Sequence, residues 1–143
     1  MVILDTDALS ILLSDEDRLL QHLEARLKRE PDRGRVTTVA CVQEALGGWM
    51  NYLTSARTRE KLLLGYERLR VAVEKCSAMQ ILPYDIPALE LFESLRKTLR
   101  RLGTMDLRIA CIARTRGATL LTRNLRDFRQ VPGLLVEDWS RGS

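Results

Sequence analysis

Three carboxylates and one amide recur beside segments that have the composition of short buried strands. Asp5 ends the run VILD, Glu44 lies on a predicted helix after RVTTV, and Asn124 ends the run ATLLTRN. Asp106 opens a further predicted helix close to Gly103. In α/β proteins the carboxyl ends of parallel strands face one crevice, where ligands bind. We therefore expect these four side chains to converge at one edge of a sheet.

A cluster of this kind predicts a site for a divalent cation. Converging carboxylates repel one another, which raises their pKa values. Mg²⁺ or Mn²⁺ relieves that repulsion and prefers oxygen ligands. Each acid alone also has a structural interpretation: Asp5 as a helix N-cap, Asp106 as a first-turn acid favoured by the helix dipole, and Glu44 as a solvated helix residue. Their joint placement favours the functional interpretation.

The segments that must position these residues alternate between strand and helix patterns. Helical periodicity predicts, among others, a helix capped by Asp85 and ended by Gly103, and a buried helix capped by Thr104. The alternation predicts an α/β fold with a mainly parallel central sheet of about four to five short strands. Short apolar or β-branched runs predict these strands over residues 2–4, 36–39, 81–82, 118–121 and 134–136.

Composition narrows the class of protein. The chain of 143 residues has the length of about one domain. Basic residues exceed acidic ones by 23 to 19, and most of the basic residues are arginine. Arginine makes bidentate contacts with phosphate, which favours a nucleic-acid partner, although a general arginine bias explains the excess equally well. Cys41, Cys76 and Cys111 are scattered without a CxxC spacing, which predicts buried thiols rather than disulfides or zinc ligands.

Other features bear on mechanism and location. His22 is the single histidine and lies in a charged segment, which excludes mechanisms that need a histidine pair or a Ser-His or Cys-His relay. The sequence begins with a predicted strand, so we expect no signal peptide before the fold. No apolar run approaches the roughly 20 residues that span a membrane. These features predict a cytoplasmic protein with no membrane partner.

Three segments together carry a family pattern: VILDTDALS, VTTVACVQEALGGW and GTMDLRIACIARTRGATLLTRNLRDFRQVPGLLVEDW. They resemble the PIN-domain family, and within it the VapC-like ribonuclease toxins of bacterial toxin–antitoxin pairs. The resemblance implies a three-layer α/β/α sandwich, with residues 1–140 as a single PIN domain and residues 141–143 as a tail. It also implies a Mg²⁺- or Mn²⁺-dependent endoribonuclease that cleaves cellular RNA, is neutralised by a small cognate antitoxin and forms a homodimer.

The resemblance also assigns roles to the acids. Asp5, Glu44 and Asp106 match the family's metal-site positions and would be the catalytic residues. At the place of the fourth acid found in many PIN domains the chain has Asn124, with Asp127 three residues further on. The amide keeps an oxygen ligand but brings no charge, so either Asp127 compensates or it is a surface acid of a helix.

Further polar residues near these positions have two interpretations. Thr6 and Thr122 could offer hydroxyls to a water at the metal, although capping and strand packing also explain them. Arg108, Arg123 and Arg126 are close in sequence to the expected site and could hold RNA phosphates. The alternative for such arginines is a solvated helix face.

A cluster of large apolar residues bears on the oligomeric state. Trp49, Tyr52 and Leu53 are more than the core of a small domain clearly needs. They support the expected homodimer weakly, and the alternative is that they pack inside the chain.

Two other functions fit parts of the pattern. Asp5, Thr6 and Asp7 after a strand match the DxD opening of haloacid-dehalogenase-type phosphatases, but the later acidic motif and the lysine of that class are missing. A non-catalytic PIN-like scaffold that only binds a partner is the other alternative, because the fourth acid is absent. Metal-dependent RNA cleavage that Asp5→Asn abolishes would separate the nuclease from both.

Overall fold

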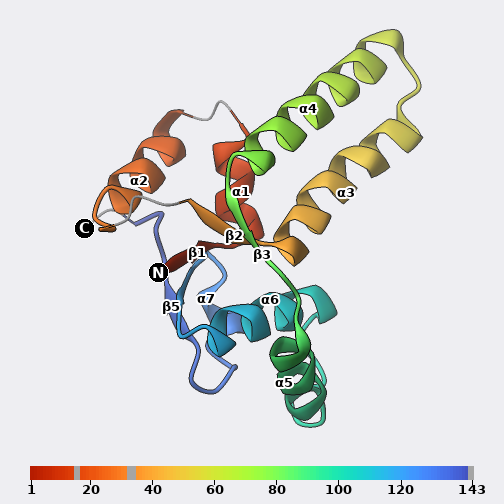
Figure 1. Cartoon of the computed structure of the whole chain (residues 1–143). Helices are drawn as coiled ribbons and strands as arrows, with labels where there is room; N and C mark the ends of the chain where they lie inside the picture. Colours follow the sequence, from red (N-terminus) through yellow and green to blue (C-terminus); the bar gives the residue numbers. More distant parts are fainter. Residues whose placement is uncertain (15–16, 32–34, 142–143) are drawn as a thin grey trace.

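A computed structural model describes residues 1–14, 17–31 and 35–141 of the chain, so the last two residues of the expected tail lie outside the described residues. Within these ranges, short strands form a parallel sheet in the order β3-β2-β1-β4-β5 (Figure 1). The strands are β1 Val2–Leu4, β2 Val36–Thr38, β3 Gln80–Leu82, β4 Thr119–Leu121 and β5 Leu135–Glu137. The prediction of a mainly parallel sheet is confirmed.

The strand order places a topological switch at the centre of the sheet. The chain leaves β1 to build β2 and β3 on one side, and later returns to pair β4 with the other side of β1. At such a switch the connections after the two adjacent strands diverge, which opens a crevice at the carboxyl edge. Residues that follow β1 and β4 therefore face each other across this crevice.

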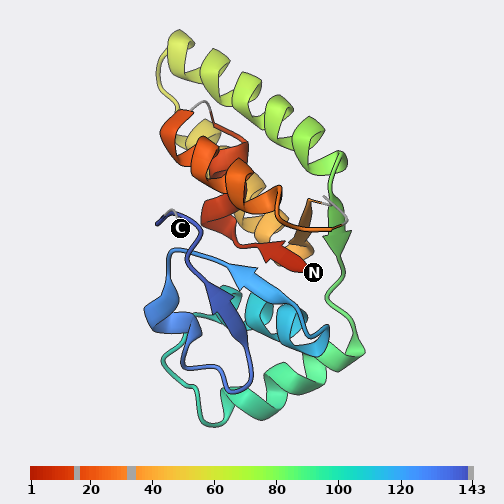
Figure 2. The same ribbon diagram turned by 90° about the vertical axis from the view of Figure 1, so that its left-hand side faces the viewer.

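Helices cover both faces of the sheet, as the three-layer prediction requires (Figures 1 and 2). One apolar cluster joins the sheet to α1 and α2, and a larger one joins it to α3, α5, α6 and α7. The buried face of α6 runs from Ile109 to Ala113 with no exposed side chain among them, as its apolar sequence predicts. The helices are α1 Thr6–Leu12, α2 Asp17–Leu27, α3 Val39–Ser55, α4 Arg59–Ser77, α5 Ile86–Arg96, α6 Thr104–Thr115 and α7 Leu125–Phe128.

Several predicted element ends are wrong by one to a few residues, and three of them have a clear local reason. β2 ends at Thr38 because the Thr38 hydroxyl accepts a 3.0 Å hydrogen bond from the Cys41 N–H and starts α3. The helix capped by Asp85 ends at Arg96 rather than at Gly103, because the segment after Arg96 folds back onto its guanidinium. Gly103, not Thr104, is the N-cap of α6.

The predicted fate of the cysteines is confirmed. All three thiols are free and buried. The search for a membrane-spanning helix within the described ranges gives a negative result.

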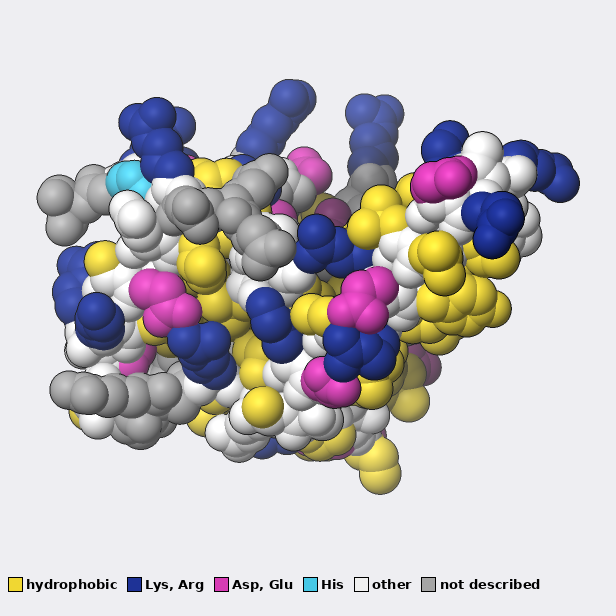
Figure 3. All heavy atoms as spheres, turned by 90° about the horizontal axis from the view of Figure 1, so that it is seen from above, with side chains coloured by type: hydrophobic (Ala, Val, Ile, Leu, Met, Phe, Trp, Pro, Cys, Tyr) yellow, Lys and Arg dark blue, Asp and Glu magenta, His cyan; other side chains and the backbone are white. Residues whose placement is uncertain are grey.

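Helices α3 and α4 form a long hairpin that projects away from the sheet (Figures 1 and 2). The two helices pack closely where Gly65 of α4 faces Leu53 and Tyr52 of α3. Beyond this contact, several large apolar side chains of α4 face outward, and hydrophobic atoms gather over the hairpin in Figure 3. They include Leu63, 73% exposed, and Tyr66, 60% exposed. The hairpin thus presents an apolar surface that the described part of the chain leaves uncovered.

Candidate active site

Asp5 lies at the switch point, where β1 passes into α1. Its residue is 5% exposed, and its backbone N–H donates to the Leu121 carbonyl of β4 at 3.0 Å. The predicted capping role is absent, because the carboxylate makes no side-chain cap bond to α1. Instead, its Oδ2 accepts a 2.7 Å hydrogen bond from the Thr122 hydroxyl, which in turn accepts from the Asn124 N–H at 3.0 Å. The side chain is therefore anchored across the crevice.

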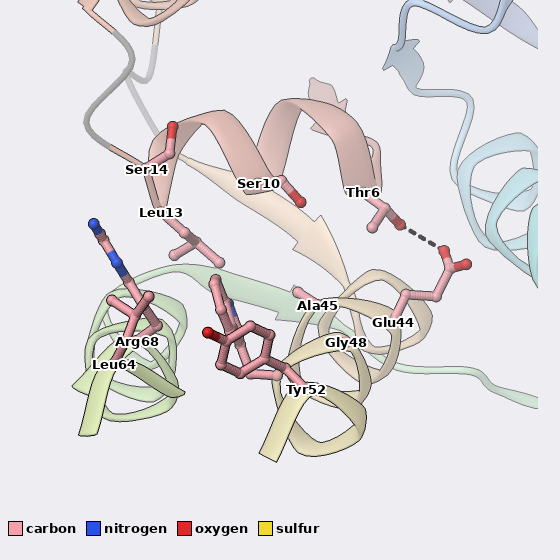
Figure 4. A pocket seen from close by; sticks show the side chains of 11 residues that line it. Thr6, Ser10, Leu13, Ser14, Glu44, Ala45, Gly48, Tyr52, Leu64 and Arg68 are labelled. Atoms are coloured by element: carbon pink, nitrogen blue, oxygen red, sulfur yellow. Dashed lines mark hydrogen bonds between the residues drawn. The ribbon is translucent and has the colours of Figure 1, made fainter. Parts of the chain in front are cut away.

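Glu44 reaches the same region from the second turn of α3. Its Oε1 accepts a 2.6 Å hydrogen bond from the Thr6 hydroxyl, and Figure 4 shows this pair at one end of a groove. Thr6 is the first residue of α1 and follows Asp5 directly. The two threonines at the site, Thr6 and Thr122, thus each hold one acid.

Asp106 enters from the first turn of α6. Its pKa is raised above the ordinary aspartate value by burial, and further by the charges of Glu44 and Asp127. Burial also raises the pKa of Asp5 to about 7, with smaller contributions from Asp7 and Asp106, against the lowering effect of the Thr122 hydrogen bond. The charges of neighbouring carboxylates thus add to the effect of burial at both Asp5 and Asp106.

The chemistry of this donor set fits a hard divalent cation. The side chains that couple to one another offer oxygen atoms only, and their shared negative charge disfavours ionisation until a cation is added. Among the described residues, no group of three or more acidic, histidine or cysteine side chains meets the geometry of a ready metal site. A cation here would therefore draw in side chains that hydroxyl groups now hold.

The amide and the acid near β4 lie together. Asn124 Nδ2 donates to Asp127 Oδ2 at 3.0 Å, and both residues are half-buried. Asp127 also raises the pKa of Asp106. A negative charge therefore stands beside Asn124, although it comes from α7 rather than from the position of the missing acid.

The arginines proposed from the sequence differ in accessibility. Arg123 and Arg126 are exposed, and the Arg123 Nε also binds Asp7 Oδ2 at 3.2 Å. Arg108 is half-buried and lies over the Phe92 ring, with its Cζ 5.8 Å from the ring centroid. Arg108 is thus part of the packing between α5 and α6.

Arg96 is a supporting residue that the sequence did not reveal. Its Nη1 donates to the carbonyls of Leu99 at 2.9 Å and Leu102 at 2.7 Å, and its Nη2 donates to the Thr104 hydroxyl at 3.2 Å. These bonds fold residues 97–103 against the start of α6, two residues before Asp106. In the sequence, Arg96 resembles an ordinary basic residue near the end of a helix, so no pattern distinguishes it.

A groove extends from the acids toward the helical hairpin (Figure 4). Its volume is about 560 Å³, and it lies between α1, α3 and α4. Thr6 and Glu44 line one end, and Leu64 and Arg68 line the other. Trp49 and Tyr52 line the middle and are half-buried, with their rings edge to face at 5.5 Å.

Comparisons with known proteins agree with this architecture. The model of the PIN-domain family matches residues 2–134. The chain is 28% identical over 123 residues to the tRNA(fMet)-specific endonuclease VapC of Salmonella typhimurium, covering 83% of this chain and 85% of that protein.

Solved structures show the same likeness. DNA-bound VapBC from Salmonella typhimurium matches with a TM-score of 0.76 and 25% identity, over 96% of this chain and 97% of that one. VapBC-5 from Mycobacterium tuberculosis, described as a member of the VapBC family of toxin-antitoxin systems, matches with a TM-score of 0.58 and 26% identity, over 94% of each chain.

The raised pKa of Asp5 predicts how the metal-free protein responds to pH. An acid whose pKa is higher in the folded state adds stability below its unfolded value near 3.8, and loses it as the pH rises through about 7. In EDTA, the free energy of unfolding should therefore fall between pH 4 and pH 8, by an amount on the order of a few kcal/mol. Urea unfolding of wild type and Asp5→Asn across this range tests it. An equal slope in the variant would contradict the assignment.

The contacts of Arg96 predict a larger effect than its exposure suggests. Arg96→Ala leaves the Leu99 and Leu102 carbonyls without their donor, so it should lower the free energy of unfolding by about 2 kcal/mol. It should also weaken Mn²⁺ binding in calorimetry, because Asp106 loses its support. Arg100→Ala is the matched control, since the Arg100 Nε binds only the Lys97 carbonyl at an exposed site. Equal losses in both variants would refute a special role for Arg96.

Proposed function

Since this chain belongs to the PIN-domain family, we propose that it is a metal-dependent endoribonuclease toxin of the VapC type, with a cognate antitoxin. The observation that carries the proposal is the convergence of carboxylates at the switch point, where the buried Asp5 side chain is coupled to Asp106. A folded chain tolerates such a cluster poorly without a ligand. We further propose that residues 1–140 form one PIN domain and that 141–143 are a tail.

Asp5, Glu44 and Asp106 would hold Mg²⁺ or Mn²⁺ as the principal ligands. Asn124 and Asp127 would stand close to the same site, with Asp127 supplying the charge that the amide lacks. When bound, the cation would supply positive charge that activates water and stabilises the charge developing on the phosphate.

The residues of the chain provide the positioning. The Thr122 hydroxyl donates its hydrogen bond to Asp5 Oδ2 and not to the other carboxylate oxygen. Thr6 fixes the Glu44 carboxylate at the mouth of the groove. Both hydroxyls restrict the rotation of the acids they bind, which keeps the carboxylates at the crevice, from where a cation would draw them into coordination.

RNA is the substrate class that this site supports. The exposed guanidiniums of Arg123 and Arg126, which follow β4 in the sequence, would hold RNA phosphates, while Arg108 contributes mainly through packing. Family membership removes the basis for the phosphatase alternative, whose DxD motif is a fragment of the PIN pattern here. A non-catalytic scaffold, the other alternative, would bind a partner but would not cleave RNA.

The antitoxin would occupy the groove between α1, α3 and α4. The apolar middle of the groove suits an apolar segment of a partner, and its acidic end lies at Glu44. An arginine or lysine from that segment could pair with Glu44, Asp5 and Asp106 and take the place of the cation. The protein and its antitoxin would meet in the cytoplasm, where the RNA substrates are.

The function is tested by cleavage of RNA. Asp106→Asn removes one proposed ligand, so it should lower the cleavage rate at least about a hundredfold and weaken Mn²⁺ binding. Glu67→Gln is the control, because Glu67 is an exposed α4 acid paired with Arg70. Growth arrest on expression should follow cleavage, being present with Glu67→Gln and absent with Asp106→Asn. Full toxicity of Asp106→Asn would overturn the proposal.

The antitoxin site is tested by two adjacent glycines of α3. A Cβ at Gly47 or Gly48 meets nothing within 4 Å, but only Gly48 lines the groove. Gly48→Leu should therefore weaken binding of the cognate antitoxin by about tenfold or more, through steric exclusion. Gly47→Leu makes the same change in helix propensity and should bind like wild type. Equal affinities in surface plasmon resonance would rule out this groove.

We also propose the homodimer, on a different surface from the one first considered. Tyr52 and Leu53 pack on Gly65 of α4 inside the hairpin, so they support it little. Leu63 and Tyr66 offer an exposed apolar face instead. Light scattering at micromolar concentration should show a particle of twice 16.4 kDa, and Leu63→Glu should dissociate it. A wild-type monomer would contradict the dimer.

A further inference from the structure

A second cavity lies at the β5 end of the sheet's carboxyl edge, and the proposed chemistry does not use it. Its volume is about 410 Å³, and it is bounded by α2 and by the residues at and after the end of β5. Arg26, Arg29, Arg141 and Trp139 are among the residues that line it. The cavity is polar, in contrast to the apolar groove beside α3.

Trp139 lines this cavity and carries a buried hydrogen-bond donor without an acceptor. The residue is 3% exposed, and its ring packs with the apolar residues under α1 and α2. Its Nε1 is buried and has no hydrogen-bond partner among the described residues. An indole N–H in this state costs free energy, which an incoming acceptor would recover.

The acids of the cavity are already engaged by other groups. Glu137 accepts two hydrogen bonds from Arg26, at 2.6 Å to Nε and 3.0 Å to Nη2. Asp138 accepts from the backbone and hydroxyl of Ser140 and pairs with Arg141 Nε at 3.3 Å. Arg29 adds a further exposed cation in the turn just after α2. With Glu137 paired to Arg26 and Asp138 paired to Arg141, Arg29 is the surplus cation of the lining, which favours an anion.

Arg123 links this cavity to the acid cluster. Its backbone N–H and its Nε donate to Asp7 Oδ2 at 3.0 and 3.2 Å, and its guanidinium Cζ lies 5.5 Å from the centroid of the Trp139 ring system. β1 and β5 are separated by β4 alone, so their ends are about 10 Å apart. A gap of this size is spanned by a few nucleotides of an RNA strand.

We propose that this cavity binds a phosphate group of the RNA strand, a few nucleotides away from the bond that is cleaved at Asp5 and Asp106. The proposal rests on the nuclease function and names a substrate contact for it. The acid cluster repels the RNA backbone, so productive binding needs positive charge at a fixed distance along the strand. The guanidiniums of Arg29 and Arg141 supply that charge, the Trp139 N–H adds a neutral donor, and the phosphate oxygens accept from all three.

The test is RNA binding in EDTA, where no divalent cation supports cleavage. The double variant R29Q/R141Q should weaken the affinity for a short fluorescent single-stranded RNA by about tenfold. It should also reduce the slope of log K against log salt by about 0.7, the value for one lost phosphate contact. The control K28Q/R59Q removes the same charge from exposed residues outside the cavity. It should stay within about twofold of wild type apart from general screening. Equal changes in the two double variants would overturn the site.

A third variant tests the indole. Trp139→Phe keeps an aromatic ring and removes the N–H, so it should weaken RNA binding by about threefold or more. If a folded Trp139→Phe variant binds RNA with wild-type affinity, the indole N–H does not contact the phosphate. If R29Q/R141Q also binds RNA with wild-type affinity, the proposal is wrong. The double variant replaces exposed side chains only, so it remains informative if Trp139→Phe unfolds.

Cleavage assays with Mg²⁺ separate this proposal from the nuclease function. A phosphate contact away from the scissile bond should raise KM in R29Q/R141Q and leave kcat unchanged. If the wild type cleaves no RNA while the double variant still binds it less tightly than K28Q/R59Q, the nuclease function fails and the phosphate site stands. If the wild type cleaves RNA and KM is equal in both double variants, the site fails alone.

Discussion

Electrostatic repulsion inside one crevice is the constraint on which the rest of this structure depends. Asp5 is almost fully buried at the end of β1, and Asp106 carries its charge to the same place from α6. The positions of both acids depend on how several helices and strands pack together. The parallel strand order β2-β1-β4 opens the crevice. The apolar residues of α6 are buried in the core, and this packing places the first turn of α6, with Asp106, at the crevice. The apolar core thus works against the preference of these charges for water.

Hydroxyl groups and one guanidinium hold this arrangement together. Thr122 and Thr6 each satisfy one acid, and Arg96 fastens the segment that leads to Asp106. These contacts connect residues that are far apart in the sequence, 117 residues for Asp5 and Thr122 and 38 for Thr6 and Glu44. The site is therefore a property of the folded chain rather than of any local motif. Its rigidity comes from neutral donors, which leave the negative charge of the acids in place for a ligand.

The sequence predicted the elements well because their local patterns are strong, and it predicted the contacts of the site less well. Short apolar or β-branched runs predicted each described strand to within a few residues, and the apolar sequence of α6 predicted that this helix is buried. The end of α5 was wrong because tertiary bonds from Arg96, which have no sequence signature, override a helical pattern. Thr6 and Thr122 were assigned mainly to capping and packing, since one sequence cannot show that their hydroxyls meet acids. The polar cavity at Trp139 combines residues from α2 and from the end of the chain, so only the fold could reveal it.

The projecting hairpin of α3 and α4 has a consequence for how such a protein can diversify. Each strand is three residues long, so a single inserted residue at the carboxyl edge would shift Thr122 away from Asp5 and reverse the direction of its side chain. The far half of the hairpin has no comparable coupling to the sheet. Adding one whole turn to both helices would lengthen the hairpin and preserve the packing of Gly65 against Leu53. Insertions can therefore change the length of the hairpin while the geometry of the acid cluster stays the same.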